Sequence, residues 1–364
     1  MNIVNIVFII NIVISLIFIN VKQTVNNKKT YIVICGVLLG FVMAFRCTPY
    51  AADYQNYSVE YRRSANMNIE ECFNEKGPLS FLVNMYLNML TPLPQTFFVF
   101  TGIFTVASFM IWIYKNSSNI PLSIIAFHGL LYYSAAMNIV RQYMAVSILL
   151  IAYDVMLKNS PSIKNFIVYG CLTYLAYLYH SSALVMLPMY FIIFLKVPQE
   201  GWKSIALYII FLIVINVMVS YGYDRFYESY DNTEGYGTDN ASIFGLLLPS
   251  AVFISAFLKR KDLISINKRN NMLINFSAMA WGFTLYSITG ALIIQRISIY
   301  FSVINILLIP EIIDVYMKKF DKKTRTIIGL LLLSIYYCTM IYLKKVPYIY
   351  QLDLWIFGGR VNLW

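Results

Sequence analysis

The stretch FFVFTGIFTVASFMIWIY at residues 97–114 contains no charged side chain. A helix needs about 20 apolar residues to cross a bilayer, so this stretch alone nearly suffices. Similar stretches recur along the 364 residues, of which 59% are hydrophobic and only 12% are charged. Soluble globular domains carry about 25% charged residues. The composition therefore excludes an ordinary water-soluble enzyme and predicts a membrane protein without a sizeable soluble domain.

The apolar stretches lack the regular alternation of membrane strands, so we interpret them as helices. They lie at residues 3–20, 31–45, 78–91, 97–114, 121–136, 139–157, 165–179, 182–195, 204–221, 242–258, 271–289, 297–315 and 326–343. We therefore predict an all-α, polytopic integral membrane protein with about 12 transmembrane helices, in a range of roughly 11 to 14. Residues 1–364 then form a single transmembrane domain.

The distribution of lysine and arginine predicts which loops face the cytoplasm, because cytoplasmic loops carry the excess of these residues. Such an excess occurs at residues 21–30, 158–164, 196–203, 259–270 and 316–325. The loops at 46–77 and 222–241 are then outside, together with the C-terminal tail at 344–364 and both termini.

This orientation requires an odd number of membrane crossings between the outer loop at 46–77 and the inner loop at 158–164. Four apolar stretches lie between these loops, so one of them does not span. The stretches at 78–91 and 121–136 are both short for a bilayer. We expect one of these two to be the stretch that does not cross.

The basic residues differ between the two faces in this topology. The 18 inner ones are mostly lysines, whereas seven of the ten outer ones are arginines. Arginine binds phosphate or carboxylate through a planar fork that lysine lacks. Arg46, Arg141 and Arg296 abut or enter apolar helices, where an ionisable group is costly and marks a functional candidate. Each arginine alone is also compatible with snorkelling or a structural ion pair. Together they indicate a site for an anionic group on the outer face.

Other chemistry-bearing residues fall near the same face. His180, one of only two histidines, ends an outward-running helix and is either a structural residue or a catalyst. If the segment after Arg46 is helical from about residue 51, Asp53 and Tyr57 lie on one helix face, at i and i+4. Tyr54 adds an aromatic surface that suits a sugar, although tyrosines are common at any membrane interface.

The remaining motifs set limits on cofactors and partners. Cys47 and Cys72 share the outer segment. They either form a disulfide or occur there without pairing, and the sequence favours neither alternative. The sequence contains no CxxC motif and no Cys/His cluster with metal-ligand spacing. Its basic stretches lack the aromatic interleaving of a nucleic-acid site. We therefore predict no metal, no cofactor and no nucleic-acid partner.

Five stretches, taken in order, resemble the EpsG/Wzy-like family over about residues 40–350. They are FR with ADYQNY at 45–57, EKGPLSFLVNMYLNML at 75–90, NIVRQYMAVSILLIAY at 138–153, LAYLYHSSALVMLPMYF at 175–191 and QRISIYFSVINILLIP at 295–310. Members of this family polymerise bacterial surface polysaccharides: O-antigen, capsule or exopolysaccharide. The resemblance implies a fold like that of C-type glycosyltransferases, which use neither a metal nor a nucleotide sugar.

The resemblance also implies a reaction and a location. The growing glycan would move from undecaprenyl pyrophosphate to the terminal sugar of a new lipid-linked repeat unit. The active site would face the periplasm or exterior from a multi-pass protein in the bacterial cytoplasmic (inner) membrane. Besides the lipid-linked oligosaccharide and the bilayer, the implied partners are a chain-length regulator and a flippase of the same pathway.

The family pattern assigns catalytic or binding roles to several residues of this sequence. These are Arg46, Asp53, Tyr57, Arg141, His180 and Arg296. The three arginines would clamp the pyrophosphate leaving group, and either the histidine or the aspartate would be the base for the acceptor hydroxyl. Tyr54, Gln142 and Tyr300 complete the predicted substrate site, with Tyr300 at i+4 from Arg296.

Three other functions stay open. An O-antigen ligase uses the same lipid-linked donor on the same face, but usually has a larger outer loop than this chain. A flippase or other transporter of lipid-linked oligosaccharide would need ionisable residues in a central cavity, whereas the predicted membrane interior is almost free of charge. A membrane O-acyltransferase would explain His180 but not the arginines.

Overall fold

The structure is a computed structural model that describes residues 2–47, 52–158, 160–198, 200–227, 244–289, 293–343 and 351–352. These residues form 18 α-helices, one short 3-10 helix and two strands. The strands β1 (Arg46–Cys47) and β2 (Gln351–Leu352) pair antiparallel. The all-α prediction is therefore confirmed. Most of the predicted outer loop at 222–241 and of the tail at 344–364 lies outside the described residues.

The chain divides into two compact units, and each is described by itself. The first consists of residues 1–154, 171–181 and 320–364, and the second of residues 155–170 and 182–319. Helix α10 (Ile163–Tyr179) contributes residues to both. Every apolar stretch predicted from the sequence forms a helix or a pair of short helices, which confirms their helical character.

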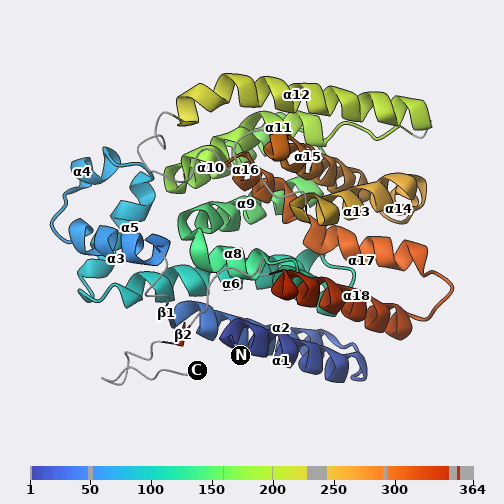
Figure 1. The fold of residues 1–364 in the computed structure, drawn as a ribbon, viewed down its shortest axis with the longest axis horizontal. Helices are drawn as coiled ribbons and strands as arrows, with labels where there is room; N and C mark the ends of the chain where they lie inside the picture. Colours follow the sequence, from blue (N-terminus) through green and yellow to red (C-terminus); the bar gives the residue numbers. More distant parts are fainter. Residues whose placement is uncertain are drawn as a thin grey trace. The chain divides into compact units, whose positions relative to one another are not determined.

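The helices of the first unit include α7, which is buried along its whole length. They are α1 (Ile3–Ile19), α2 (Val25–Ala44), α3 (Ala52–Ser64), α4 (Ile69–Phe73), α5 (Pro78–Asn88), α6 (Gln95–Asn116), α7 (Ile120–Gly129), α8 (Tyr132–Asn138), most of α9 (Val140–Lys158) and α18 (Lys322–Tyr342). Helices α1, α6, α8 and α18 contact α7. Figure 1 shows α1 and α18 side by side, as their contacts also indicate. Helix α7 is mostly apolar, with Ser123 and His128 as exceptions, and such a helix is stable where its neighbours bury every residue.

The last helix of the described residues, α18, packs against α1. The Tyr337 hydroxyl donates a hydrogen bond to Asn5 Oδ1 at 2.8 Å, and the Tyr337 ring lies 4.1 Å from the Phe8 ring. At the other end of α18, Asn119 Nδ2 donates to Thr326 Oγ1 at 2.7 Å. Helix α18 therefore satisfies polar side chains of α1 and of the residue that caps α7.

Helix α2 packs closely against α6 near its C-terminal end, just before Arg46, the first residue of the predicted site. A Cβ atom on Gly102 would lie only 3.0 Å from the backbone nitrogen of Ala44, so this approach needs a glycine. Gln95 Nε2 donates to Ala44 O at 2.5 Å and fixes the N-terminal turn of α6 to the end of α2.

Helix α15 forms the centre of the second unit, where it contacts α11, α12, α13, α16 and α17. The helices are η1 (Ser181–Val185), α11 (Met186–Ile193), α12 (Gly201–Tyr227), α13 (Phe244–Leu258), α14 (Arg260–Ile266), α15 (Asn270–Thr289), α16 (Ile293–Ser302) and α17 (Asn305–Tyr316). Asn275 Nδ2 on α15 donates to Leu195 O at 2.7 Å and to Ile193 O at 3.0 Å. These bonds satisfy backbone carbonyls that the end of α11 leaves open.

Within the described residues, four helices are long and apolar enough to cross a membrane, namely α2, α6, α9 and α18. Two bent pairs raise this number to six if each pair is one span. They are α7 with α8, bent by 48°, and α16 with α17, bent by 57°. Leu131 begins the break in the first pair with a left-handed φ of +67°. The predicted count of about twelve helices stays a prediction.

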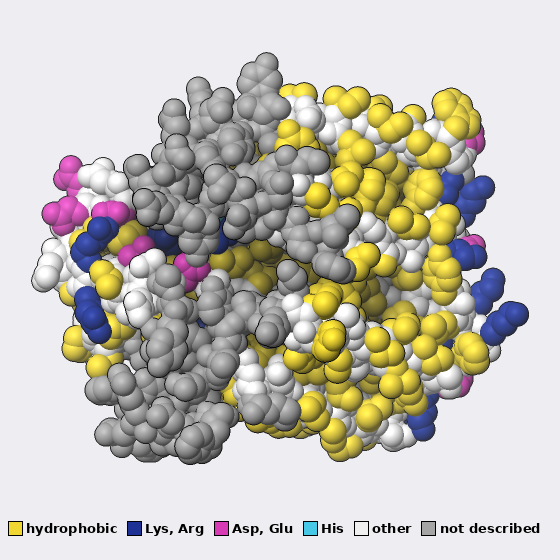
Figure 2. Space-filling model, in the orientation of Figure 1, with side chains coloured by type: hydrophobic (Ala, Val, Ile, Leu, Met, Phe, Trp, Pro, Cys, Tyr) yellow, Lys and Arg dark blue, Asp and Glu magenta, His cyan; other side chains and the backbone are white. Residues whose placement is uncertain are grey.

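The surface distribution of side chains agrees with a multi-pass membrane protein. Figure 2 shows hydrophobic side chains over the helices, and Lys and Arg side chains gathered at helix ends. Ile111, Ile213 and Ile335, for example, are 55%, 57% and 63% exposed. Hydrocarbon is the environment in which exposed apolar helix faces of this kind are stable.

Candidate functional site

Helix α3 forms after Arg46 as the sequence predicts. Asp53 lies in its first turn, where a carboxylate stabilises the positive end of the helix dipole. Tyr57, Tyr61 and Ser64 are buried, and their spacing of four and three residues makes one buried face. Asp53 and Tyr57 are both within the helix, so the predicted i, i+4 relation between them is confirmed.

Aromatic contacts hold α3 against the start of α6. The Tyr54 ring stacks on Phe98, with centroids 4.3 Å apart and planes 7° from parallel. The Tyr57 ring lies 5.4 Å from the Phe97 ring and is 9% exposed. The Tyr61 hydroxyl donates to Thr91 O at 2.7 Å. Tyr54 and Tyr57 thus contribute to positioning α3 through their packing.

Arg46 is buried, with only 1% of its surface exposed. Its Nε donates to Met137 O at 3.0 Å, and its Nη1 donates to Met43 O. The guanidinium also lies 5.0 Å from the centroid of Phe98, within cation–π distance. Arg46 therefore ties the end of α2 to the last turn of α8.

Arg141 is the second residue of α9 and reaches three different parts of the first unit. Nη1 donates to Lys76 O at 3.1 Å, and Nη2 lies 3.5 Å from Glu60 Oε1. The guanidinium carbon lies 5.7 Å from the Tyr57 ring centroid. A cation at a helix N-terminus is unfavourable, and the Glu60 carboxylate offsets this. The Arg141 side chain remains 27% exposed, so part of it faces solvent.

The turn at Lys76–Pro78 connects Arg141 with the residues before His180. Gly77 has a left-handed φ of +83°, and Pro78 follows it as the first residue of α5. A Cβ atom on Gly77 would lie 2.8 Å from Tyr179 O and 3.7 Å from Arg141 Nη1. Only glycine fits this backbone approach without strain. The turn, the Arg141 guanidinium and the end of α10 therefore meet at Gly77.

His180 directly follows the last residue of α10 and is half-buried. Its backbone N–H donates to Ala176 O at 3.0 Å, which closes the helix. The structure thus places the backbone next to His180 beside Arg141, although these residues are far apart in the sequence. Gln142, the neighbour of Arg141, is buried with 1% of its surface exposed.

Glu60 belongs to this cluster, although it was not among the residues predicted from the sequence. It lies three residues after Tyr57 and seven after Asp53, which puts it on the same side of α3. Its Oε2 is buried and makes no hydrogen bond to any described residue. Burial raises the pKa of Glu60, while the nearby Arg141 guanidinium opposes that rise. A carboxylate on the apolar side of an amphipathic helix was the signal available in the sequence.

Replacing Glu60 with Gln is expected to raise the melting temperature at pH 7. Burial disfavours the carboxylate, so the folded pKa exceeds the unfolded one. The Glu60 side chain therefore stabilises the fold fully only below its pKa in the unfolded chain. This contribution to the stability is lost as the pH rises through the pKa of Glu60 in the folded protein. The advantage of the Glu60→Gln variant should therefore shrink toward pH 4. Thermal unfolding of the detergent-purified protein at several pH values measures it.

The control for this prediction is Glu75→Gln. Glu75 is also paired with an arginine, Arg63, but that pair is at the surface, with side chains 33% and 52% exposed. Surface ion pairs contribute little to stability, so Glu75→Gln should leave the melting temperature almost unchanged at every pH. A lower melting temperature of Glu60→Gln at pH 7 would mean that the pair with Arg141 outweighs the cost of burial.

Arg296 and Tyr300 lie on α16 of the second unit, one helical turn apart as the sequence predicts. Tyr300 is fully buried, and its hydroxyl lies 2.9 Å from Ser182 Oγ in a hydrogen bond. Arg296 is half-buried. Arg296 and Arg141 belong to different units, and their joint participation in one site stays a prediction.

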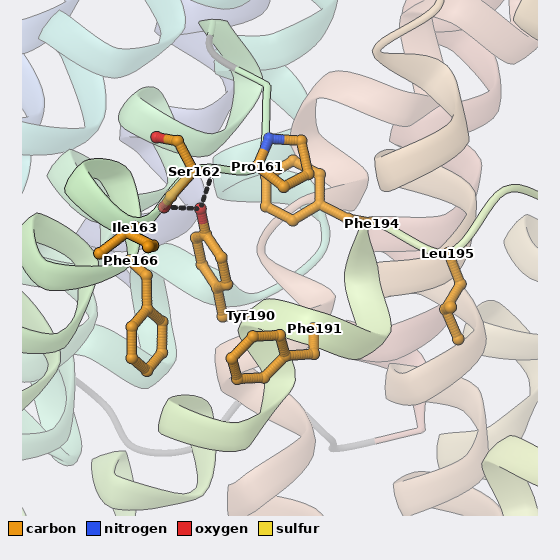
Figure 3. Close-up of a pocket in the computed structure, with 8 residues that line it drawn as sticks. All are labelled: Pro161, Ser162, Ile163, Phe166, Tyr190, Phe191, Phe194 and Leu195. Atoms are coloured by element: carbon orange, nitrogen blue, oxygen red, sulfur yellow. Dashed lines mark hydrogen bonds between the residues drawn. The ribbon is translucent and has the colours of Figure 1, made fainter.

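The second unit also contains an apolar pocket of about 500 Å³, shown in Figure 3. Aromatic and aliphatic side chains from the start of α10 and from α11 line it. The Tyr190 hydroxyl accepts from Ser162 N and donates to Ser162 O, both at 3.2 Å. None of the predicted site residues lines this pocket.

The outer cysteines are the last of the predicted features. Cys72 is free and buried, and it packs with Phe81 and Met85 of α5. The side chain of Cys47 lies outside the described part of the structure. Cys72 therefore contributes an apolar contact between α4 and α5.

Comparison with known proteins identifies the family. Searches of curated proteins and of solved structures found no match. The model of the EpsG family matches residues 29–352. This match includes the Arg141 cluster, α16 and all six candidate spans except the first few residues of α2. The resemblance seen in the sequence is thereby confirmed, and the chain belongs to the EpsG family.

Proposed function

We propose that this protein is a polysaccharide polymerase that transfers a growing glycan between lipid carriers. Membership of the EpsG family indicates a role in exopolysaccharide biosynthesis. The donor would be a glycan on undecaprenyl pyrophosphate, and the acceptor the terminal sugar of a new lipid-linked repeat unit. The observation that carries the proposal is Arg141, a partly exposed guanidinium held by Glu60 and Lys76 O beside the end of α10.

This transfer needs hydrogen-bond donors that stabilise the leaving pyrophosphate and a base that accepts the proton of the acceptor hydroxyl. The bond between the anomeric carbon and the pyrophosphate oxygen breaks, while the acceptor hydroxyl oxygen forms the new glycosidic bond. Negative charge builds on the departing pyrophosphate, and preorganised donors aimed at that charge lower the barrier. Arg141 has the planar fork suited to this role. We assign Arg46 to positioning α2 and α8, because two of its donors bond to the backbone carbonyls of Met137 and Met43.

The acceptor hydroxyl loses its proton to a base, and His180 is our first choice. An unperturbed histidine has a pKa of about 6.5, which suits a general base near neutral pH. Asp53, in the first turn of α3, is the rival base. Arg296 would supply a second cation to the pyrophosphate, with Tyr300 one turn away on the same helix.

Helix lengths support a topology in which α5 does not cross the membrane. Its 11 residues span about 16 Å, roughly half of a hydrocarbon core. We therefore assign the non-spanning stretch to residues 78–91 and treat α7 with α8 as one broken span. About twelve spans with both termini outside would then place the Arg141 cluster on the outer face of the bacterial cytoplasmic membrane.

Replacing His180 with Ala is expected to abolish polymer while the protein inserts at the normal level. The physical reason is the loss of the group that accepts the hydroxyl proton, which is worth about 100- to 10,000-fold in rate. Glycan extracted from a deletion strain carrying the variant should consist of single repeat units. Asp53→Asn is the matched comparison, because it removes the rival base on α3. Wild-type chain lengths from His180→Ala together with short chains from Asp53→Asn would transfer the role to Asp53.

The full deletion separates the competing functions. Surface glycan of one repeat unit supports the polymerase. Polymer that remains attached to its lipid carrier would indicate a ligase, and absence of any repeat unit outside would indicate a flippase. Either of these last two outcomes overturns the proposal.

A further inference from the structure

A second cavity of about 560 Å³ opens in the first unit among the ends of its helices. The α1–α2 loop, the end of α6 and the starts of α7 and α18 surround it. In Figure 1 the α1–α2 loop and the start of α18 lie at the end of this unit away from α3. The cavity is therefore separate from the Arg141 cluster, and none of the residues given a catalytic role lines it.

The lining of the cavity is strongly basic. Lys28, Lys115, Lys322 and Lys323 contribute to it, and no Asp or Glu is among the lining residues. The nearest acid along the chain is Asp321, which caps α18 and whose oxygens accept hydrogen bonds from the backbone of residues 323 and 324. Three helices, α2, α7 and α18, also begin at this cavity, and their N-termini carry partial positive charge. The electrostatics favour an anionic ligand.

The cavity also offers directed polar groups. Lys322 Nζ on α18 donates to Ser118 O at 3.3 Å, across the cavity in the α6–α7 loop. Ser118 Oγ is buried and makes no hydrogen bond to any described residue. The Thr326 hydroxyl donates to Lys322 O at 2.8 Å, so its oxygen is fixed at the wall. A phosphate oxygen is an acceptor that the lysines and the Ser118 hydroxyl can satisfy together.

An apolar wall also lines the cavity. It is formed by Ile19, Val25, Ile120 and Pro121. A free inorganic anion gains nothing from these side chains, whereas the glycerol and first acyl carbons of a lipid would bury them from water. Lys28, Lys322 and Lys323 lie in stretches that the positive-inside rule places at the cytoplasmic surface, and Lys115 lies on the same side if α5 does not cross the membrane. Basic pockets between helices recognise anionic lipids at that surface.

We propose that this cavity binds the phosphate headgroup of an anionic phospholipid of the inner leaflet. The four lysines neutralise the phosphate, the Ser118 hydroxyl donates to it, and the apolar wall receives the start of the acyl chains. The bound lipid would join α1, α2, α6, α7 and α18 at one end of the first unit.

The test measures binding of phosphatidylglycerol to the detergent-purified full-length protein by native mass spectrometry and by the shift in melting temperature. The pocket variant is K28Q/K115Q/K322Q/K323Q, which should weaken phosphatidylglycerol binding by on the order of tenfold or more. Phosphatidylcholine should bind weakly to the wild type because its headgroup has no net charge. The charge-retaining variant K28R/K115R/K322R/K323R should bind phosphatidylglycerol within about threefold of the wild type.

The matched control is K196Q/K261Q/K268Q/K318Q, which removes four exposed lysines outside the cavity. This variant should bind phosphatidylglycerol within about twofold of the wild type. Equal weakening by the pocket and control variants would overturn the proposal, because binding would then depend on net charge alone. Inorganic phosphate that raises the melting temperature as much as phosphatidylglycerol at equal concentration would also overturn it, because the cavity would then be a site for a free anion.

Discussion

Replacing Arg141 with Lys is expected to remove the polysaccharide ladder and leave glycan of one repeat unit. Lysine keeps the charge but loses the fork that donates to Lys76 O and faces Glu60 at the same time. The loss of one preorganised donor to a developing oxyanion costs about 3 kcal/mol, which is on the order of 100-fold in rate. Gel electrophoresis of surface glycan from a complemented deletion strain measures the chain length.

Arg63→Lys is the matched control for this result. Arg63 also pairs with a carboxylate, Glu75, and also lies over an aromatic ring, that of Phe81 at 5.1 Å. It differs from Arg141 in being about half exposed. The Arg63→Lys variant should therefore give a normal ladder. A normal ladder from Arg141→Lys, with the protein inserted at the wild-type level, would contradict the role of Arg141 at the leaving group.

Gly77→Ala is expected to reduce polymer length as strongly as the loss of a catalytic side chain, although it adds only a methyl group. The left-handed φ of +83° costs a residue with a Cβ about 1–2 kcal/mol. The new Cβ would also lie 2.8 Å from the rigid carbonyl oxygen of Tyr179, so the turn has to move. Movement of the turn displaces Lys76 O from Arg141 and changes the approach to His180.

The measurements for Gly77→Ala are glycan chain length and the melting temperature of the purified protein. Gly170→Ala is the control, because its Cβ would meet only the Leu187 side chain at an ordinary 3.7 Å. The control should keep its chain length and melting temperature. A wild-type ladder from Gly77→Ala would mean that the turn does not hold Arg141 in its working position.

The helices of this protein could be predicted from the sequence because apolar length is a local property. The stretch at 121–136, for instance, was predicted as one helix, whereas the structure divides this region into α7 and α8 at Leu131, which has a left-handed φ. The pairing of Asp53 with Tyr57 on one helix face was likewise predictable from spacing alone. The hydrogen bond of Arg46 to Met137 O joins residues 91 positions apart, so it could not be predicted from local pattern.

The candidate site was predicted by residue type rather than by contact. Arginines near helix ends were recognisable because charge is rare in this chain. Glu60 was missed because its carboxylate has meaning only beside Arg141, which α9 supplies from a distant part of the sequence. The close approach of Gly77 to Tyr179 is equally non-local. The arginines could therefore be recognised from the sequence, whereas the partners of Arg141, Glu60 and Lys76 O, become apparent only in the fold.

The contact of α18 with α1 and α7 has a consequence for biosynthesis. Membrane helices are inserted in the order of translation, and α18 is the last helix of the described chain. Until it leaves the ribosome, Asn5 and Asn119 lack the partners that Tyr337 and Thr326 provide. The first unit therefore cannot complete its packing during synthesis of the preceding 300 or so residues. A ribosome that stalls before α18 would therefore leave an intermediate in which the side chains of Asn5 and Asn119 lack these two hydrogen bonds.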